Sequence, residues 1–271
     1  MRNSRMQRME PVFAVLTLAT ALLTAAGCAD TATRDNLRAG YGALEAKQYD
    51  AAVQKADEQL TKAPQGPGSA EALYLKGRAL EAKASPGGNS TNPDADWQAA
   101  RAAYVDALNL NPSPDLEAHI RAGVANVAYF QNDYTTALQQ WSTAYDKIRD
   151  EETNAWILYR IGVCQQRLNQ FDAADKTFAT VQDKYKSTEA ADRARTHSGF
   201  KNFNVQLTRW GAQQPADNAV MQLRKEGAPA TRMTDPHGQS AVYVGPAATY
   251  QQALQLKARY ASRFPDAAIV P

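Results

Sequence analysis

The sequence predicts an α-helical solenoid of repeated helix pairs, followed by a small α+β domain with a split-βαβ order. Small residues recur at a fixed interval between residues 33 and 186, within hydrophobic patterns typical of amphipathic helices. After Lys201 the pattern changes to the alternation of half-buried strands. The expected division is an N-terminal leader at 1–27, a tether at 28–32, the helical repeats with a capping helix at 33–199, and the terminal domain at 200–271.

An alanine three residues after an aromatic residue marks each repeat. The four alanines are Ala52, Ala100, Ala137 and Ala174. The aromatic residues before them are Tyr49, Trp97, Tyr134 and Phe171. With Ser85–Ala95 treated as an 11-residue insertion, all three steps between markers are 37 residues. Each marker also has a small residue 12 positions upstream, once the insertion is removed, and these are Gly40, Gly77, Ala125 and Gly162. Small residues let two helices cross closely, so the pattern predicts stacked helix pairs.

This pattern resembles the tetratricopeptide repeat, whose usual period is about 34 residues. The second repeat matches the family's positions best, at Gly77, Trp97, Ala100, Tyr104, Ala107 and Pro112. The resemblance implies a concave groove, lined by the first helix of each pair, that binds a protein or peptide partner. The groove residues it predicts are Tyr41, Tyr74, Arg78, His119, Asn126, Tyr129, Trp156 and Tyr159. The alternative for each of them is plain core packing between repeats.

Two further segments of the helical region have compositions that suggest their roles. Ser187–Gly199 is rich in alanine and is expected to be a capping helix, because a solenoid buries surface only between neighbouring repeats. Ser85–Ala95 is rich in glycine, proline and asparagine and is expected to be a mobile loop.

Residues 1–27 have the pattern of a signal peptide, with three arginines before an apolar run that is too short to span a bilayer. The run ends in Ala25-Ala26-Gly27-Cys28, which resembles the bacterial lipoprotein signal. The resemblance implies cleavage before Cys28 and its lipidation, so that the membrane is contacted through the lipid anchor only. The residue after Cys28 is Ala29 and not the aspartate that resembles an inner-membrane retention signal, so the resemblance implies the periplasmic face of the outer membrane. An ordinary secretory signal with an incidental cysteine is the alternative.

Charge and motif content argue against nucleic-acid binding and against catalysis. The leader holds three of the 30 basic and one of the 28 acidic residues, which leaves 27 of each in the remaining chain. The histidines His119, His197 and His237 lack metal-ligand spacing, and no phosphate loop or nucleophile elbow is present. We therefore expect neither an enzyme nor a cofactor, nor a metal. Cys164, within a predicted helix, is expected to be a buried small residue.

The terminal segment reads as β-α-β-β-α-β. Strands are predicted at 203–207, 230–234, 241–244 and 267–270, and helices at 218–226 and from Thr249 onward. Gly227 is expected to end the first helix, and Thr249 with Gln252 forms a capping box at the start of the second. This order predicts one antiparallel sheet with both helices on one face and with the first and third strands adjacent.

This segment resembles the SPOR domain of bacterial cell-envelope proteins. The matching residues are Phe203-x-Val205-Gln206-Leu207, the helix ended by Gly227, Val244-Gly245-Pro246, and the helix with Ala253 and Leu256. The resemblance implies binding to peptidoglycan glycan strands that have lost their stem peptides. Two positions depart from the family, because Ser240 replaces a frequent aromatic residue and Ala241 replaces an expected basic one.

Alternation along the first and third strands predicts which side chains face away from the helices. With Trp210 beyond the strand as a stacking surface, the predicted glycan-binding residues are Asn204, Gln206, Thr208, Trp210 and Tyr243. Amides and hydroxyls beside an aromatic ring suit a neutral sugar, although a solvated outer face is the ordinary alternative.

Two functions follow from the whole sequence. The first is a lipid-anchored adaptor of the cell envelope, including division sites, that binds a protein through its repeats and peptidoglycan through its terminal domain. The second is a scaffold in outer-membrane or division machinery whose terminal domain binds protein.

Overall fold

The computed structural model describes residues 31–234 and 238–271, and they fall into two compact units that divide between Ile161 and Gly162. The predicted signal peptide, most of the tether, Cys28 and His237 lie outside the described residues. The division falls inside one helix, α7 (Glu151–Arg167), and the two units are described separately below. No helix within the described ranges is both long and apolar enough to cross a membrane.

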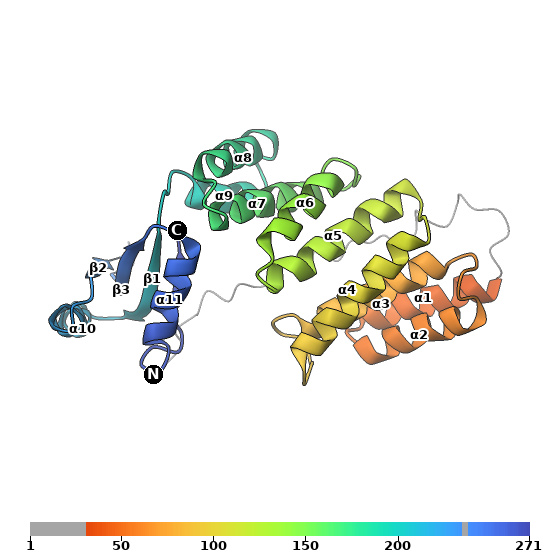
Figure 1. The fold of residues 1–271 in the computed structure, drawn as a ribbon, viewed down its shortest axis with the longest axis horizontal. Helices are drawn as coiled ribbons and strands as arrows, with labels where there is room; N and C mark the ends of the chain where they lie inside the picture. Colours follow the sequence, from red (N-terminus) through yellow and green to blue (C-terminus); the bar gives the residue numbers. More distant parts are fainter. Residues whose placement is uncertain (1–30, 235–237) are drawn as a thin grey trace. The chain divides into compact units, whose positions relative to one another are not determined.

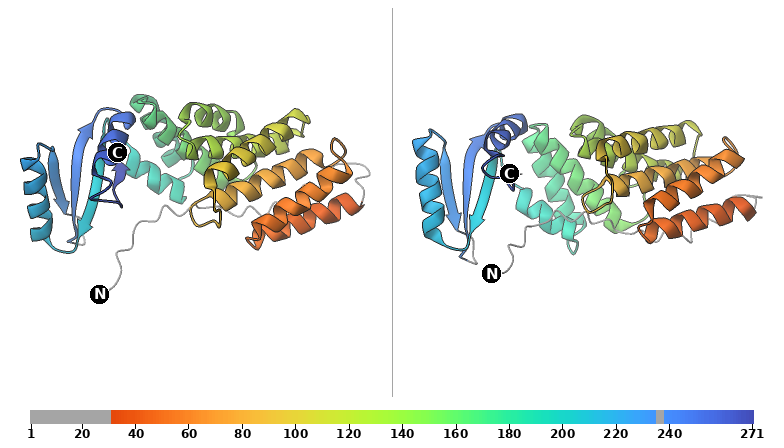
Figure 2. Two further views of the ribbon diagram at one scale, coloured as in Figure 1. Left: turned by 60° about the horizontal axis from the view of Figure 1, so that its bottom comes forward. Right: turned by 90° about the horizontal axis from the view of Figure 1, so that it is seen from below.

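The first unit is built from helices that pack on one another in chain order (Figures 1 and 2). They are α1 (Thr31–Glu45), α2 (Tyr49–Lys62), α3 (Ser69–Ala84), α4 (Pro93–Asn109), α5 (Pro114–Phe130) and α6 (Tyr134–Ala144), followed by the first part of α7. The aromatic residues of the sequence pattern begin α2 and α6, as predicted. The helical nature of this region is therefore confirmed.

The turns between paired helices repeat one geometry. Lys47, Asn132 and Asn169 each lie five residues before a marker alanine, and each has a left-handed backbone, with φ of 58°, 62° and 61°. The next residue in each turn donates its backbone N–H to a carbonyl five residues earlier, as in a Schellman motif. The 37-residue spacing is thus matched by a recurring backbone conformation.

The small residues of the pattern lie at close crossings between helices. The marker alanines Ala100 and Ala137 have no exposed surface. A Cβ atom added to Gly77 would lie 2.5 Å from Cε1 of the Tyr104 ring, and one added to Gly123 would overlap the same ring. Tyr104 is fully buried between these two glycines. Ala125, the predicted small residue of the third repeat, is also fully buried.

The predicted insertion is a shorter loop than expected. It covers residues 85–92, because Asn92 caps α4 by accepting a hydrogen bond from the backbone N–H of Ala95. The loop is tied to its neighbours, since the backbone N–H of Ser90 donates to the Lys83 carbonyl and its hydroxyl donates to Asp96 at 2.6 Å. Pro93 and Asp94 therefore belong to the first turn of α4, where proline fits because its missing N–H has no helical partner.

The second unit continues α7 into two more helices and then a sheet. The helices α8 (Phe171–Lys184) and α9 (Glu189–His197) pack together, and α9 lies where a capping helix is predicted. They are followed by β1 (Phe203–Trp210), α10 (Gln213–Lys225), β2 (Ala230–Thr234), β3 (Ser240–Ala247), α11 (Tyr250–Tyr260) and β4 (Ala268–Val270). Compared with the prediction, β1 extends three residues further and α10 begins five residues earlier.

The sheet is antiparallel throughout, with strand order β2-β3-β1-β4. The first and third strands are adjacent, as the split-βαβ order predicts. Val205, Leu207 and Val244 from the strands form one core with Val220 and Leu223 of α10 and with residues of α11. Gly227 has φ of 81°, and the capping box of Thr249 and Gln252 is present. The C-terminal end of α10 and the start of α11 were therefore predicted correctly.

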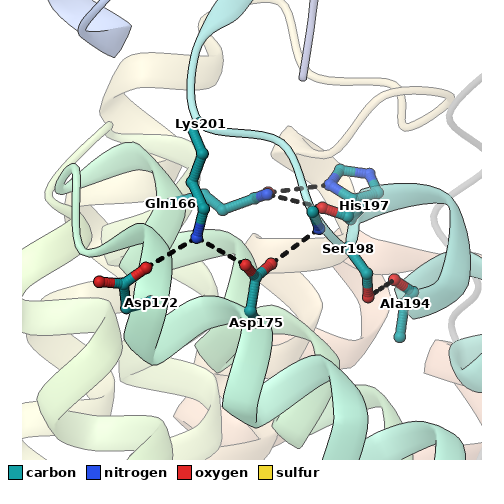
Figure 3. Close-up of polar contacts among 8 residues, drawn as sticks. Gln166, Asp172, Asp175, Ala194, His197, Ser198 and Lys201 are labelled. Atoms are coloured by element: carbon teal, nitrogen blue, oxygen red, sulfur yellow. Dashed lines mark hydrogen bonds and ion pairs between the residues drawn. The ribbon is translucent and has the colours of Figure 1, made fainter.

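The segment that leads from α9 into β1 is held against α8 (Figure 3). Lys201 Nζ forms ion pairs of 2.7 Å with Asp172 and with Asp175, and Asp175 also accepts the backbone N–H of Gly199. The Gln166 side chain binds both the ring and the backbone carbonyl of His197. The start of β1 is thus fixed to the helices before it.

The same junction has an aromatic side. The ring of Phe171, at the start of α8, lies 5.7 Å from the ring of Phe203, the first residue of β1. Phe203 in turn contacts Tyr250 of α11 with ring centroids 5.4 Å apart. The terminal sheet therefore packs on α8 through side chains as well as through the polar contacts of Lys201.

Candidate functional site

The open face of the sheet brings together two of the predicted binding residues. Gln206 of β1 lies directly opposite Tyr243 of β3, and the Tyr243 hydroxyl donates to Gln206 Oε1 at 3.2 Å. Asn204 lies two residues before Gln206, opposite Val270 of the edge strand β4. All three side chains are partly exposed, while Val205 between them is fully buried. The predicted alternation holds over this part of β1.

The alternation breaks at Leu207, which is an extra residue in β1 relative to β3. The register passes from Gln206 opposite Tyr243 to Thr208 opposite Val242, so β1 has a β-bulge at this point. Val242 is fully buried in the core on the helix side. Simple alternation predicted that Thr208 shares the face of Gln206. Because of the bulge, it does not.

Trp210 is also displaced from the predicted face. Its partner across the sheet is Ser240, and its ring packs against the core formed by α10, α11 and the inner side of the strands. The prediction of a stacking surface next to Gln206 fails because the bulge reverses the direction of the residues that follow it.

The residue that the bulge does place on the open face is Arg209, which sequence reasoning missed. Arg209 lies opposite Ala241, and its Nη2 donates to Gln206 Oε1 at 3.3 Å. Ala241 is the position at which the sequence lacks the basic residue expected from the SPOR resemblance. The Arg209 guanidinium on the neighbouring strand lies opposite this position. A bulge has no periodic signature in the sequence. The sole hint of this one was the basic residue Arg209 near the end of the predicted strand.

A second candidate site is a pocket of about 110 Å³ among α3, α5, α6 and α7 of the first unit. Five of the predicted groove residues line it: Tyr74, Arg78, His119, Asn126 and Trp156. They come from α3, α5 and α7, which are not consecutive in the chain.

A chain of hydrogen bonds runs along the pocket. Glu81 is almost fully buried and accepts from the Tyr104 hydroxyl at 2.5 Å and from Asn126 Nδ2 at 2.9 Å. Asn126 Oδ1 in turn accepts from Arg160 at 2.6 Å, and Arg78 donates to the Tyr74 hydroxyl at 2.9 Å. Glu81 and Arg160 are central to this site, although neither was predicted to belong to it.

The titratable groups of the pocket have shifted pKa values. Burial raises the pKa of the Glu81 carboxyl above its usual value, against the opposing effect of the Arg78 guanidinium. Burial also lowers the pKa of the His119 imidazole, so this ring is neutral at neutral pH. The pocket thus offers guanidinium and amide donors beside aromatic rings, an arrangement suited to holding part of a polypeptide.

Three predicted groove residues lie elsewhere. Tyr41 packs against a separate core cluster of α1 to α3 with Leu37 and Leu75. The Tyr129 ring contacts the rings of Tyr134 and Trp141 between α5 and α6. Tyr159 is buried against Trp156. These residues fit the core-packing alternative that the sequence left open.

The remaining residues singled out in the sequence are placed as follows. Cys164 is buried in the second unit, and Cys28 lies outside the described residues. Within residues 31–234 and 238–271 no group of three or more His, Cys, Asp or Glu side chains is arranged to hold a metal ion.

Comparison with known proteins identifies the terminal segment. Residues 199–271 match the SPOR domain family. No curated protein matches the chain. A SPOR domain is a peptidoglycan-binding module used in cell division, and such domains occur in bacterial envelope proteins. The match covers the whole four-stranded sheet and begins just before Lys201, at the junction with α8 and α9.

Proposed function

We propose that this protein is a lipid-anchored adaptor of the bacterial cell envelope, without enzymatic activity. Its SPOR domain binds peptidoglycan glycan strands through the open face of the sheet, and its helical region holds a protein partner. The observation that carries the proposal is the SPOR match over a sheet whose open face presents Gln206, Tyr243 and Arg209 together.

The chemistry of this face suits a sugar chain. Gln206 Oε1 already accepts from two protein donors, the Tyr243 hydroxyl and the Arg209 guanidinium. Its Nε2 group has no hydrogen-bond partner among the described residues, and the side chain is partly exposed, so the amide can still donate to a ligand. A sugar acetamido carbonyl can accept from this amide, and the Tyr243 ring beside it provides an apolar platform.

For the helical region we propose a tetratricopeptide solenoid whose concave side binds a segment of a partner protein. The recurring left-handed turns and the glycines against Tyr104 support this interpretation. The pocket lined by Arg78, Asn126 and Trp156 is large enough for one side chain or one chain end of the partner.

For the anchor we propose cleavage before Cys28, its lipidation and retention at the outer membrane. The support is the sequence Ala25-Ala26-Gly27-Cys28 after an apolar run. Acyl chains contribute about 0.8 kcal/mol per buried methylene, so more than one chain holds a protein stably at a membrane. The partner-binding and glycan-binding sites would then face the periplasm.

The test of glycan binding is co-sedimentation of the purified full-length protein with peptidoglycan sacculi. The variant carries Gln206→Ala with Tyr243→Ala, and the matched control is Gln255→Ala, an exposed amide on α11. Loss of one hydrogen bond costs about 0.5–1.5 kcal/mol, so the double variant should lose most of its sedimentation. The control should keep it, with unchanged circular dichroism for both.

The same experiment decides between the two functions. If the wild-type protein does not sediment with sacculi, or if the double variant sediments as well as the wild type, the glycan-binding face is refuted. The second candidate then leads, in which the terminal domain is a protein-binding module of an envelope or division complex. The exposed Met233 on the open face of β2 is the observation that favours it, because a large apolar side chain there suits a protein contact.

A further inference from the structure

The pocket of the first unit has more basic than acidic side chains in its wall. Two arginines, Arg78 of α3 and Arg160 of α7, line this space of about 110 Å³, and among the described residues that line it Glu81 alone is acidic. His119 also lines the pocket and adds no charge at neutral pH, because burial lowers the pKa of its imidazole. The composition of the wall therefore favours a ligand group with a negative charge.

Arg78 is partly buried without a carboxylate partner. Within the described ranges its guanidinium forms no ion pair, and it donates instead to the neutral Tyr74 hydroxyl at 2.9 Å. The nearby Glu81 carboxylate is engaged elsewhere, since its two oxygens accept hydrogen bonds from Tyr104 and from Asn126. A charge that is withdrawn from water is ordinarily paired with an opposite one. The position of Arg78 therefore suits a carboxylate that a ligand supplies.

The second guanidinium of the pocket is held in place by the protein. Arg160 Nη1 donates to Asn126 Oδ1 at 2.6 Å, and the guanidinium carbon lies 5.5 Å from the centroid of the Trp141 ring. Asn126 is fixed in turn by its own hydrogen bond to Glu81. Because these contacts order Arg160 before a ligand arrives, little side-chain freedom is lost when the ligand binds.

The oxygen acceptors that line the pocket are already used by the protein. The Tyr74 hydroxyl receives a hydrogen bond from Arg78, and Asn126 Oδ1 receives one from Arg160. Both oxygens of Glu81 are likewise engaged. The carboxylate at the end of a polypeptide lies one carbon from a backbone N–H, which needs an acceptor when it is buried. The carboxylate of an aspartate or glutamate side chain brings no such donor, so it fits this pocket better than a chain end does.

We propose that the helical region recognises an acidic side chain of its partner polypeptide, and that Arg78 and Arg160 bind the aspartate or glutamate carboxylate in this pocket. This inference rests on the proposed partner binding and names the chemical group that is recognised. A guanidinium matches a carboxylate geometrically and forms charge-assisted hydrogen bonds with it. The rings of Tyr74, His119 and Trp156 line the same pocket and provide apolar surface for the methylene groups of that side chain.

The test presents the full-length protein with three pools of short peptides, all acetylated at the N-terminus. The first pool has a central glutamate, an amidated C-terminus and randomised uncharged residues at the other positions. The second pool differs by a central glutamine, and the third has the central glutamine with a free C-terminal carboxylate. Mass spectrometry identifies the peptide that immobilised protein retains most strongly from the first pool. This peptide is resynthesised in all three forms, and the Kd of each form is measured by calorimetry.

We expect the wild type to bind the glutamate form about tenfold more tightly than the glutamine form, which corresponds to about 1.4 kcal/mol. Arg78→Gln should lose most of this preference by binding the glutamate form more weakly, with unchanged affinity for the glutamine form. The charge-matched control is Arg38→Gln, an exposed arginine on α1, and it should behave as the wild type.

Two further variants separate the charge of Arg78 from its structural contact with Tyr74. Tyr74→Phe removes the hydrogen bond between these side chains and keeps the guanidinium, so it should retain the preference for glutamate. Arg78→Lys keeps the charge without the planar fork and should retain part of the preference. Circular dichroism and thermal melts show whether each variant is folded. A folded Arg78→Lys variant with no preference contradicts recognition through charge.

The outcomes distinguish this inference from the function on which it rests. A wild type that binds the glutamate and glutamine forms equally, or an Arg78→Gln variant that weakens both equally, overturns the role of Arg78 and leaves partner binding in place. Tighter binding of the free chain end than of the central glutamate overturns the assignment to an acidic side chain. A wild type that retains none of the pools removes the proposed peptide binding by the helical region itself.

Discussion

Adding one methyl group at Gly77 should destabilise the first unit, although alanine is the better helix former. A Cβ atom at this position would lie 2.5, 2.7 and 2.9 Å from three carbons of the Tyr104 ring, well inside van der Waals contact. The ring has no room to move, because Gly123 approaches its other side and Glu81 holds its hydroxyl. Overpacking of this kind costs about 1–3 kcal/mol, against a helix-propensity gain of about 0.5–1 kcal/mol.

The matched control is Gly42→Ala in α1, because nothing lies within 4 Å of a Cβ atom at Gly42. It should stabilise by the propensity gain alone. The propensity gain is common to both variants, so they should differ by the overpacking cost of roughly 1–3 kcal/mol, or by several degrees in Tm, since 1 kcal/mol shifts the Tm of a domain of this size by about 2–4 °C. Thermal melts followed by circular dichroism measure both variants in parallel.

A double-mutant cycle isolates the contact. Tyr104→Leu removes the ring that the new methyl group would strike, so Gly77→Ala should cost much less in that background than in the wild type. If Gly77→Ala and Gly42→Ala shift Tm alike, or if the cost of Gly77→Ala is the same in both backgrounds, the close crossing of α3 and α4 does not constrain residue 77.

Three further predictions concern other parts of the chain. Burial and the Arg167 charge lower the pKa of His197 from 6.5 to about 4, so the unfolded chain takes up a proton before the folded one as pH falls below 6.5. Up to ~3 kcal/mol of folding stability should therefore be lost between pH 6.5 and 4. The Tm of His197→Gln should fall less than the Tm of the wild type over this pH range, and an equal fall in both proteins would contradict the assignment. Ala100→Leu should cost about 1–3 kcal/mol by overpacking, whereas Asn89→Ala in the exposed 85–92 loop should change Tm by almost nothing, and equal shifts would contradict the phasing of the repeats. Cys28→Ser should release the protein from membranes to the soluble periplasmic fraction or leave it unprocessed, and a soluble wild type with an unmodified N-terminus would refute lipidation.

The sequence predicted those features that have a period. Helix pairs, the small residues at their crossings and the alternation at Phe203–Leu207 all repeat at fixed intervals, and the structure places them as expected. The helix-ending Gly227 and the capping box that begins at Thr249 depend on local sequence, and both were predicted equally well.

Features without a period were missed. The bulge at Leu207 inserts one residue and reverses all that follow, so Thr208 and Trp210 were placed on the wrong face and Arg209 was overlooked. In the helical unit, Glu81 is a charged residue whose burial depends on Tyr104 and Asn126 from other helices. Such partners meet only in three dimensions, and no spacing in the sequence indicates them.

The junction at Lys201 has a mechanical consequence. If the sheet is bound to the wall while the rest of the chain is held by the membrane, tension enters the sheet at Phe203, the first residue of β1. This strand is central, paired with β3 on one side and β4 on the other. The ladder hydrogen bonds of antiparallel strands run perpendicular to the strands, so a pull along β1 loads them together, in shear, rather than one after another. The ion pairs of Lys201 with Asp172 and Asp175 lie two residues before β1, so they are loaded together with the start of this strand.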